Sequence, residues 1–200
     1  MRFLCVGFSW RTFLFFRGLY KLKEEKNIWC VNLKDNRKEE YRNKDGQIKF
    51  RLCKEKRIVT IGWGVKEPVN LWEEYKEIAD KVYKGDRGYA AARNALEKIK
   101  YGDLVWTKNP VTEEYYIAEI TGKSDIPSIF NDLIEFDTCA YKRCRFFSVD
   151  NKYIIGPLCK TKVRAIRAIE KMGTEKRGDT IKATIERFNI CKGAQNEREQ

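Results

Sequence analysis

The chain has 200 residues and a formal net charge of +12, and 13% of its residues are aromatic. This length suits one domain with a hydrophobic core, and the aromatic content argues against an intrinsically disordered chain. The sequence contains no histidine. That absence excludes Ser-His-Asp and Cys-His catalysis within the chain, and also zinc sites of the His/Cys deaminase type.

The positive charge favours a polyanionic partner. Basic side chains release counterions from nucleic acid when they bind it, and they attract it from a distance. Nucleic acid is therefore the first partner to consider. The alternative interpretation is an ordinary solvated surface rich in lysine.

Cysteine usage points to a reducing compartment. The seven cysteines are odd in number and include no Cys-x-x-Cys pair. We expect reduced thiols packed as small apolar residues in a cytoplasmic protein, with no metal site and no cofactor. A four-cysteine zinc site assembled from distant positions is the alternative.

The chain divides into an extension, a domain and a tail. Residues 1–26 are apolar and basic, residues 27–190 form the expected domain, and residues 191–200 are a polar tail. The apolar run near the N-terminus is too short to span a membrane, and Arg11 interrupts it. A core or edge strand is the favoured interpretation of this run; an interfacial segment and sequence outside the domain are alternatives.

The predicted elements indicate an α+β fold. Strands are expected at 28–33, 48–52 and 57–61, and a polar loop at 34–46 connects the first two. Asn70 is a candidate cap for a helix over 71–83, and a second helix covers 89–100. A hairpin pairs 104–107 with 115–120 around Asn109-Pro110. Further strands at 146–149 and 153–155, a helix at 160–172, a strand at 180–185 and a frayed end from 192 complete the prediction.

The first notable motif is Gly62-Trp63-Gly64, which directly follows a predicted strand. Two glycines allow close backbone approach around the tryptophan. Trp63 could stack on a flat base, or it could fill the core beside a turn.

The second motif begins with Ala92-Arg93-Asn94 on the second predicted helix. The Asn94 amide could read a base edge or bond helix to loop, and Arg93 could contact phosphate or pair with Glu97. The motif continues through Gly102-Asp103 into Trp106-Thr107-Lys108. Turn chemistry favours a structural role for the Gly-Asp pair.

The order strand, Gly-Trp turn, helices, Gly-Asp turn and strand resembles the PUA-like superfamily over residues 27–188. The resemblance is strongest to its EVE and YTH branches and to the N-terminal domain of bacterial modification-dependent restriction proteins. It implies a small mixed β-barrel with flanking helices that binds nucleic acid, with a modified or flipped base in an aromatic pocket. The candidate ligand-binding residues here are Gly62, Trp63, Gly64, Arg93, Asn94, Trp106, Thr107, Lys108 and Tyr115.

A set of basic residues could follow the phosphate backbone. Lys160, Arg164, Arg167 and Lys171 share one face of the third predicted helix, and Lys142, Arg143 and Arg145 could extend their surface. A solvated amphipathic helix is the alternative interpretation.

Together these patterns predict a nucleic-acid-binding module that is not an enzyme, with DNA favoured over RNA. The resemblance implies a reader in a prokaryotic defence system of the restriction type, whose effector partner, such as a nuclease, would do the cutting. One alternative is a protein-interaction or membrane-associated subunit that uses the apolar N-terminus. The other is a metal-dependent nuclease without a recognisable signature, for which Glu113, Glu114 and residues 132–137 supply the acidic side chains.

Overall fold

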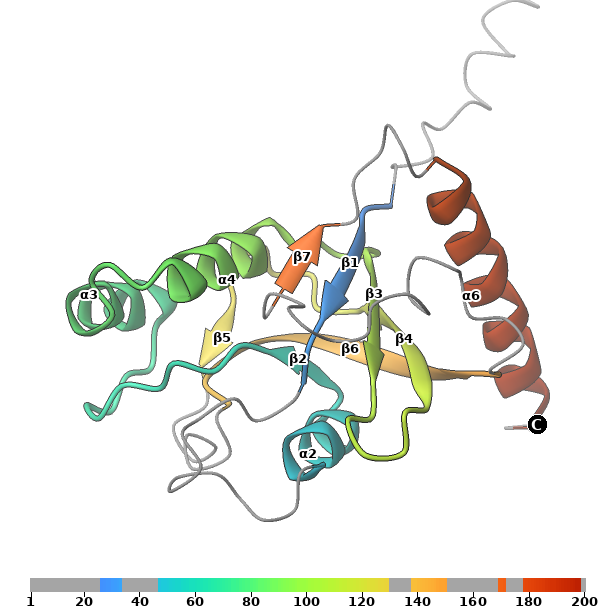
Figure 1. Ribbon diagram of the computed structural model, residues 1–200, viewed down its shortest axis with the longest axis horizontal. Coiled ribbons are helices and arrows are strands. Elements are labelled where there is room, and N and C mark those ends of the chain that lie inside the picture. The colour runs from blue at the N-terminus through green and yellow to red at the C-terminus, as the bar shows by residue number, and fades with distance from the viewer. Residues whose placement is uncertain (1–25, 34–46, 130–137, 151–168, 172–177, 199–200) are drawn as a thin grey trace, which may run out of the picture.

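The computed structural model describes residues 26–33, 47–129, 138–150, 169–171 and 178–198. Within these ranges a curled half-barrel sheet of seven strands is flanked by four helices, which confirms the α+β class (Figure 1). The elements are β1 (Ile28–Val31), α2 (Ile48–Lys56), β2 (Ile58–Thr60), α3 (Trp72–Val82), α4 (Arg87–Lys98), β3 (Leu104–Lys108), β4 (Tyr115–Ile120), β5 (Ser128–Ile129), β6 (Ala140–Val149), β7 (Ile169–Lys171) and α6 (Gly178–Arg198).

The sheet has the strand order β2-β6-β4-β3-β1-β7, and β5 also pairs with β6. Strands β1 and β3 are parallel, whereas the other pairs are antiparallel. The ten-residue strand β6 pairs with β2 and β5 through its first half and with β4 through its second half. This one strand therefore joins the two parts of the curled sheet.

Alternating side chains build a separate hydrophobic cluster on each face of the sheet. The inner cluster contains Trp29, Val105 and Tyr116 and packs against α2, α3 and α4. The outer cluster contains Leu104 and Trp106 and is closed by Phe188 from α6. Figure 1 accordingly shows α6 on the side of the sheet away from α3 and α4.

Several predicted elements are confirmed with small shifts at their ends. These are the strands at 28–33 and 57–61, the helices at 71–83 and 89–100, and the hairpin of β3 and β4. The predicted strand at 146–149 is the second half of the longer β6. Asn70 is not the helix cap, because α3 is preceded by Leu71, and the Glu74 carboxylate accepts the N–H groups of Asn70 and Leu71 at 3.2 and 3.3 Å.

The strand predicted at 48–52 is wrong, because this segment is helix α2. Phe50 and Cys53 lie three residues apart and are both buried in the inner cluster, as one helical face requires. The alternation of five residues also fits a strand, so the short pattern alone was ambiguous. The helix ends at Lys56, and the left-handed backbone of the next residue, Arg57 (φ 56°), turns the chain into β2.

The C-terminal predictions are also wrong wherever the structure describes them. Residues 180–185 and 192–198 belong to α6, and residues 169–171 of the predicted third helix form β7. Thr184 and Phe188 are buried one helical turn apart, and Cys191 packs against the same outer cluster. The β-branched residues suggested a strand, whereas packing against the sheet selects the helix.

Other predictions lie outside the described residues: the N-terminal extension through residue 25, the loop at 34–46 and the strand at 153–155. Cys53, Cys139 and Cys144 are buried in the inner cluster, as expected for thiols that pack as small apolar residues. Burial raises the pKa of the Cys144 thiol well above its usual range. Within the described ranges, no helix is both long enough and apolar enough to cross a membrane.

Candidate functional site

The Gly62-Trp63-Gly64 turn is held in a strained conformation by hydrogen bonds. Trp63 has φ 61°, which is unfavourable for a residue with a bulky side chain. Tyr75 donates to the Trp63 carbonyl at 2.9 Å, and Tyr83 donates to the Gly64 carbonyl at 2.5 Å. The two tyrosines come from α3 and its C-terminal end, so the helix fixes the turn.

The Trp63 indole is anchored to the start of α4. Its Nε1 donates to Asp86 Oδ2 at 3.1 Å, while Asp86 Oδ1 caps the helix by accepting the N–H groups of Gly88 and Tyr89 at 2.7 and 3.1 Å. Burial opposes ionisation of Asp86, but these three hydrogen bonds outweigh it and lower its pKa below the ordinary value. The ring is half-buried and packs beside Tyr89, with centroids 6.3 Å apart.

Arg93 and Asn94 lie on α4, close to each other and to α3. The Arg93 guanidinium donates to both carboxylate oxygens of Asp80, rather than to Glu97 as one prediction had it. Asn94 is exposed, and its Oδ1 accepts from Arg93 Nε at 3.3 Å. Asp80 therefore already neutralises the cation that we predicted for phosphate contact.

Trp106 and Thr107 do not line an open pocket. Trp106 is 1% exposed, belongs to the outer cluster and donates from Nε1 to Thr184 Oγ1 at 3.0 Å. Trp63 packs against the inner cluster on the opposite face of the sheet. The structure therefore places Trp106 and Trp63 with different clusters and does not bring them together in one site. Thr107 is buried on β3, and its hydroxyl has no partner among the described residues.

The other basic and aromatic candidates are scattered. Lys108 pairs with Glu113 at 3.1 Å and lies 5.9 Å from the centroid of the half-buried Tyr115 ring. Arg143 is exposed on β6, and the Arg145 guanidinium lies 5.3 Å from the Phe147 ring centroid. The positions Lys160, Arg164 and Arg167 lie outside the described residues, whereas Lys171 belongs to strand β7 and not to the predicted helix.

Lys142 cannot contact the phosphate groups of a nucleic acid in this conformation, because it is only 3% exposed. Burial lowers the pKa of its ammonium group. The Nζ atom donates to the carbonyl oxygens of Ser124 and Asp125, at 3.3 and 2.5 Å. Lys142 thus fixes the loop that follows Lys123.

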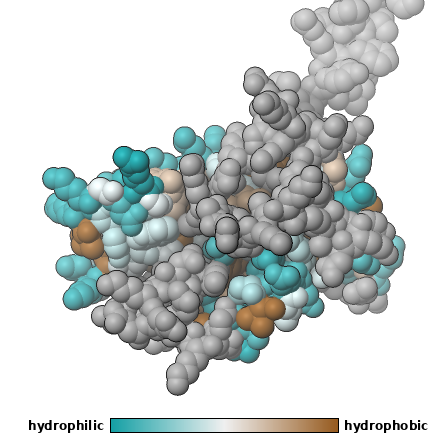
Figure 2. Space-filling view, in the orientation of Figure 1, coloured by the Kyte–Doolittle hydropathy of each residue, from teal (hydrophilic) through white to brown (hydrophobic). Residues whose placement is uncertain are grey.

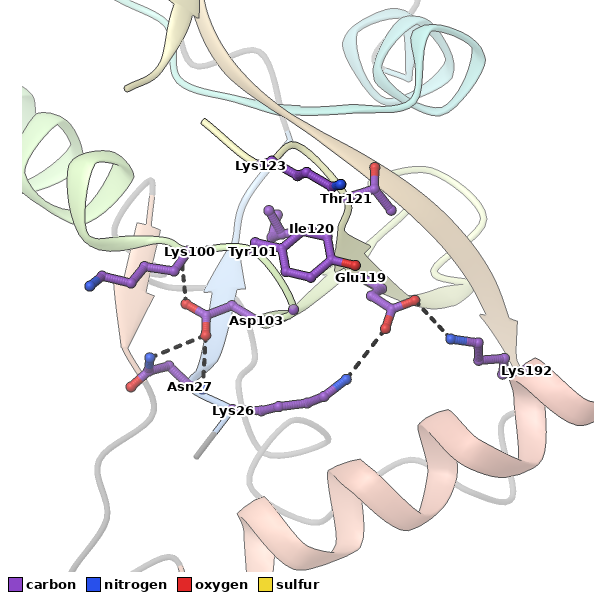
Figure 3. A pocket seen from close by; sticks show the side chains of 11 residues that line it. Lys26, Asn27, Lys100, Tyr101, Asp103, Glu119, Ile120, Thr121, Lys123 and Lys192 are labelled. Carbon is purple, nitrogen blue, oxygen red and sulfur yellow. Dashed lines mark hydrogen bonds and ion pairs between the residues drawn. The ribbon is translucent and has the colours of Figure 1, made fainter. Parts of the chain in front are cut away.

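The structure brings together a different set of residues around a half-open cavity of about 770 Å³ (Figure 3). Its walls come from the chain before β1, the turn between α4 and β3, the end of β4 and helix α6. Four of the lining residues are lysines, and we call this feature the lysine cavity. The lysines are Lys26, Lys100, Lys123 and Lys192.

One of the two carboxylates in the lysine cavity has a structural role. Asp103 is buried and accepts the backbone N–H groups of Asn27 and Lys100, both at 3.0 Å. It also accepts from the Asn27 side chain at 3.1 Å and from Trp29 Nε1 at 2.8 Å. This bonding confirms the turn role predicted for Asp103. Gly102 beside it has φ 83°, a conformation that favours glycine.

The second carboxylate, Glu119, lies between two lysines. Its Oε1 is 3.3 Å from Lys26 Nζ and its Oε2 is 3.1 Å from Lys192 Nζ. Lys100 and Lys123 are exposed and have no ion-pair partner within the described ranges. Four lysines against two carboxylates leave the lining with a net charge of +2.

Tyr101 adds an aromatic surface to this positive site. Its side chain is 56% exposed, and Figure 3 shows it together with Lys123 and Glu119 around the hollow. An exposed aromatic ring beside lysines is the combination that binds unpaired bases and their phosphates. The sequence patterns predicted only that Lys100 ends a helix and that Tyr101 leads into the Gly102-Asp103 turn. Their position before Gly102-Asp103 was the available signal, whereas Lys26 and Lys192 come together only through the fold.

Candidates for metal-dependent chemistry are sparse in the described part of the chain. No group of three or more cysteine, aspartate or glutamate side chains there is placed to hold a metal ion. Glu113 pairs with Lys108, and Glu114 accepts from the Tyr116 hydroxyl at 3.2 Å. The acidic residues at 132–137 lie outside the described ranges.

Comparison with known proteins gives no relative. No protein-family model matches the chain, and neither a curated protein nor a solved structure matches it. The resemblance to the PUA-like superfamily therefore remains a hypothesis that depends on the quoted motifs.

Proposed function

We propose that this chain is a nucleic-acid-binding module whose contact surface is centred on the lysine cavity. The observation that carries the proposal is that the exposed Tyr101 ring lines the same cavity as Lys100 and Lys123, two exposed lysines without an ion-pair partner among the described residues. The whole chain has a net charge of +12 and so attracts polyanions. The positively charged cavity provides one local site where a polyanion can bind.

The chemistry of the site favours unpaired nucleotides. A base stacked on Tyr101 would contribute about 1–3 kcal/mol, and the lysines would contact the adjacent phosphates. A base can reach an aromatic ring in this way only if it is single-stranded or turned out of a duplex. Trp63 is a second candidate stacking residue, but its half-buried ring would first have to leave Asp86.

The curled half-barrel with flanking helices is compatible with a PUA-like barrel. On that resemblance we extend the proposal to a reader of modified or flipped bases, preferably in DNA, within a prokaryotic restriction-type defence system. Its action would lie in the cytoplasm, where thiols stay reduced. Cleavage would belong to a separate effector, such as a nuclease.

The surface in view gives less support to a protein-interaction subunit. Figure 2 shows the described residues on this face as mainly hydrophilic, with hydrophobic side chains in small separate areas. Of the exposed apolar residues, Leu71 precedes α3 and Val111 lies in the turn between β3 and β4. Scattered apolar side chains of this kind are normal for a protein surface.

The proposal is tested by the salt dependence of binding. Fluorescence anisotropy would measure affinity for labelled single-stranded DNA and RNA from about 50 to 200 mM salt. We expect Lys100→Gln/Lys123→Gln to weaken binding and to reduce the log–log salt slope by about 1 per lost phosphate contact. The control is Lys66→Gln/Lys84→Gln, which removes two exposed lysines elsewhere. Equal losses in both double variants, or no binding at low salt, would contradict the proposal.

A further inference from the structure

We propose that the lysine cavity is a binding site for a terminal phosphate, a phosphomonoester, and that Glu119 discriminates against the internal phosphodiesters of nucleic acid. The inference rests on the proposed function and narrows its ligand. It starts from the fact that the cavity contains its own anion, placed between two of its four lysines.

Glu119 connects three separate parts of the chain. It lies on β4, whereas Lys26 precedes β1 and Lys192 lies on α6. Each carboxylate oxygen binds one ammonium group, and the Glu119 side chain is only 17% exposed. A single negative charge thus compensates two positive charges and leaves one of them without a counterion in this group.

The two ammonium groups have a second anchor. Lys26 Nζ lies 4.9 Å from the centroid of the Phe188 ring, and Lys192 Nζ lies 5.1 Å from the same centroid. Phe188 is buried in the outer cluster. Attraction between each cation and the ring keeps both ammonium groups near this position when an incoming anion replaces the carboxylate. The site is therefore preorganised for an anion that binds both lysines.

Charge decides which anion can compete with Glu119. A phosphodiester carries one negative charge, so it offers the two lysines no more than the carboxylate already gives. A phosphomonoester carries about −1.5 to −2 at neutral pH and has three strong acceptor oxygens. It can bind Lys26 and Lys192 at the same time, with Lys123 lining the same cavity. The geometry therefore favours the phosphorylated end of a nucleic acid, or a free nucleotide, over an internal phosphate.

The volume and the aromatic rim fit the same ligand. A cavity of about 770 Å³ is within the range that holds a small ligand such as a nucleotide. With the phosphate between the lysines, the exposed Tyr101 ring offers a stacking surface for the attached base.

The test measures the affinity of the full chain for four ligands. Three are forms of one short single-stranded oligonucleotide: 5′-phosphorylated, 3′-phosphorylated and phosphorylated at neither end. The fourth is a nucleoside monophosphate. Inorganic phosphate serves as competitor. We expect one phosphorylated form to bind at least about fivefold tighter than the unphosphorylated form. The monophosphate and inorganic phosphate arms separate a nucleic-acid end from a free nucleotide or a free phosphate as the source of the group.

Two substitutions then probe the mechanism. Glu119→Gln should raise affinity for the unphosphorylated oligonucleotide more than for the phosphorylated one, so that the ratio between them falls. The matched control Glu113→Gln removes the same charge from the other end of the β3–β4 hairpin and should leave the ratio unchanged. Lys192→Gln should also lower the ratio of the two affinities, but by weakening the binding of the phosphorylated oligonucleotide alone. This second variant tests the mechanism even if Glu119→Gln fails to fold.

The outcomes separate the two proposals. Oligonucleotide binding that depends on Lys100 and Lys123 but ignores terminal phosphorylation overturns the phosphomonoester site and leaves the proposed function standing. A ratio that is unaffected by both Glu119→Gln and Lys192→Gln overturns the role of this lysine pair. Absence of oligonucleotide binding in every variant overturns the proposed function, and absence of monophosphate binding as well overturns the phosphomonoester site with it.

Discussion

Two tryptophans of this chain are held by the same device in very different surroundings. Trp29 donates from its indole nitrogen to Asp103 at 2.8 Å, and Trp63 donates to Asp86 at 3.1 Å. In each pair the aspartate also accepts backbone N–H groups of a turn or helix start. The Asp103 pair is buried, whereas Asp86 is exposed and Trp63 is half-buried.

The difference shows which aromatic residue is positioned for a ligand. The buried pair fixes the turn at Gly102, and this rigid turn carries the exposed Tyr101. At the exposed pair the tryptophan ring is itself bound to the aspartate, so its edge is already occupied. The first pair thus supports a site beside it, while the second pair mainly supports the start of α4.

The largest effect should come from breaking the buried pair. Asp103→Ala would leave four hydrogen-bond donors without their acceptor, at Asn27, Trp29 and Lys100. An unsatisfied buried donor costs about 1–3 kcal/mol. Trp29 Nε1 is buried and the other three donors are part-buried, so we expect the free energy of unfolding to fall by about 3 kcal/mol. Denaturant unfolding measures this loss. A loss below about 1 kcal/mol would show that the pair does not hold the turn.

Breaking the exposed pair should have a smaller effect that depends on pH. Asp86→Ala removes a helix cap, which is worth about 1 kcal/mol. The hydrogen bonds of Asp86 lower its folded-state pKa below the ordinary 3.8. Its contribution is therefore complete above about pH 4 and is lost as pH falls through the lowered pKa.

Unfolding curves between about pH 7 and pH 2.5 check this expectation. The stability difference between the natural chain and Asp86→Ala should shrink in the acid range. Glu67→Ala, which removes an exposed carboxylate without a cap role, should show no such convergence. A difference that persists unchanged at the lowest pH would contradict the cap assignment.

The sequence predicted those elements whose local pattern agrees with their packing. Helix α4 has a cap and an apolar face, and the β3–β4 hairpin has a turn between two apolar strands. The failures at α2 and α6 occurred where a short pattern suits two structures and burial decides between them. Burial of Phe50 in the inner cluster and of Phe188 in the outer cluster favours the helix over the strand in these two segments.

The candidate site was predicted only in its general chemistry. Positive charge and an aromatic residue were expected, but Trp106 became a core residue, and Arg93 was neutralised by Asp80. The lysine cavity joins Lys26 to Lys192 across nearly the whole described chain. No local pattern reports such a juxtaposition, because β1 and α6 are brought to the end of β4 by tertiary packing.

The most direct test of the central claim is to locate the contact itself. Ultraviolet crosslinking of a single-stranded oligonucleotide to the full chain, followed by mass spectrometry of its peptides, identifies the stacked side chain. The account predicts a crosslink at Tyr101, which Tyr101→Ala abolishes while Tyr115→Ala leaves it intact. Crosslinks confined to other peptides, with a yield that Tyr101→Ala does not change, would contradict the assignment of the lysine cavity as the nucleic-acid contact.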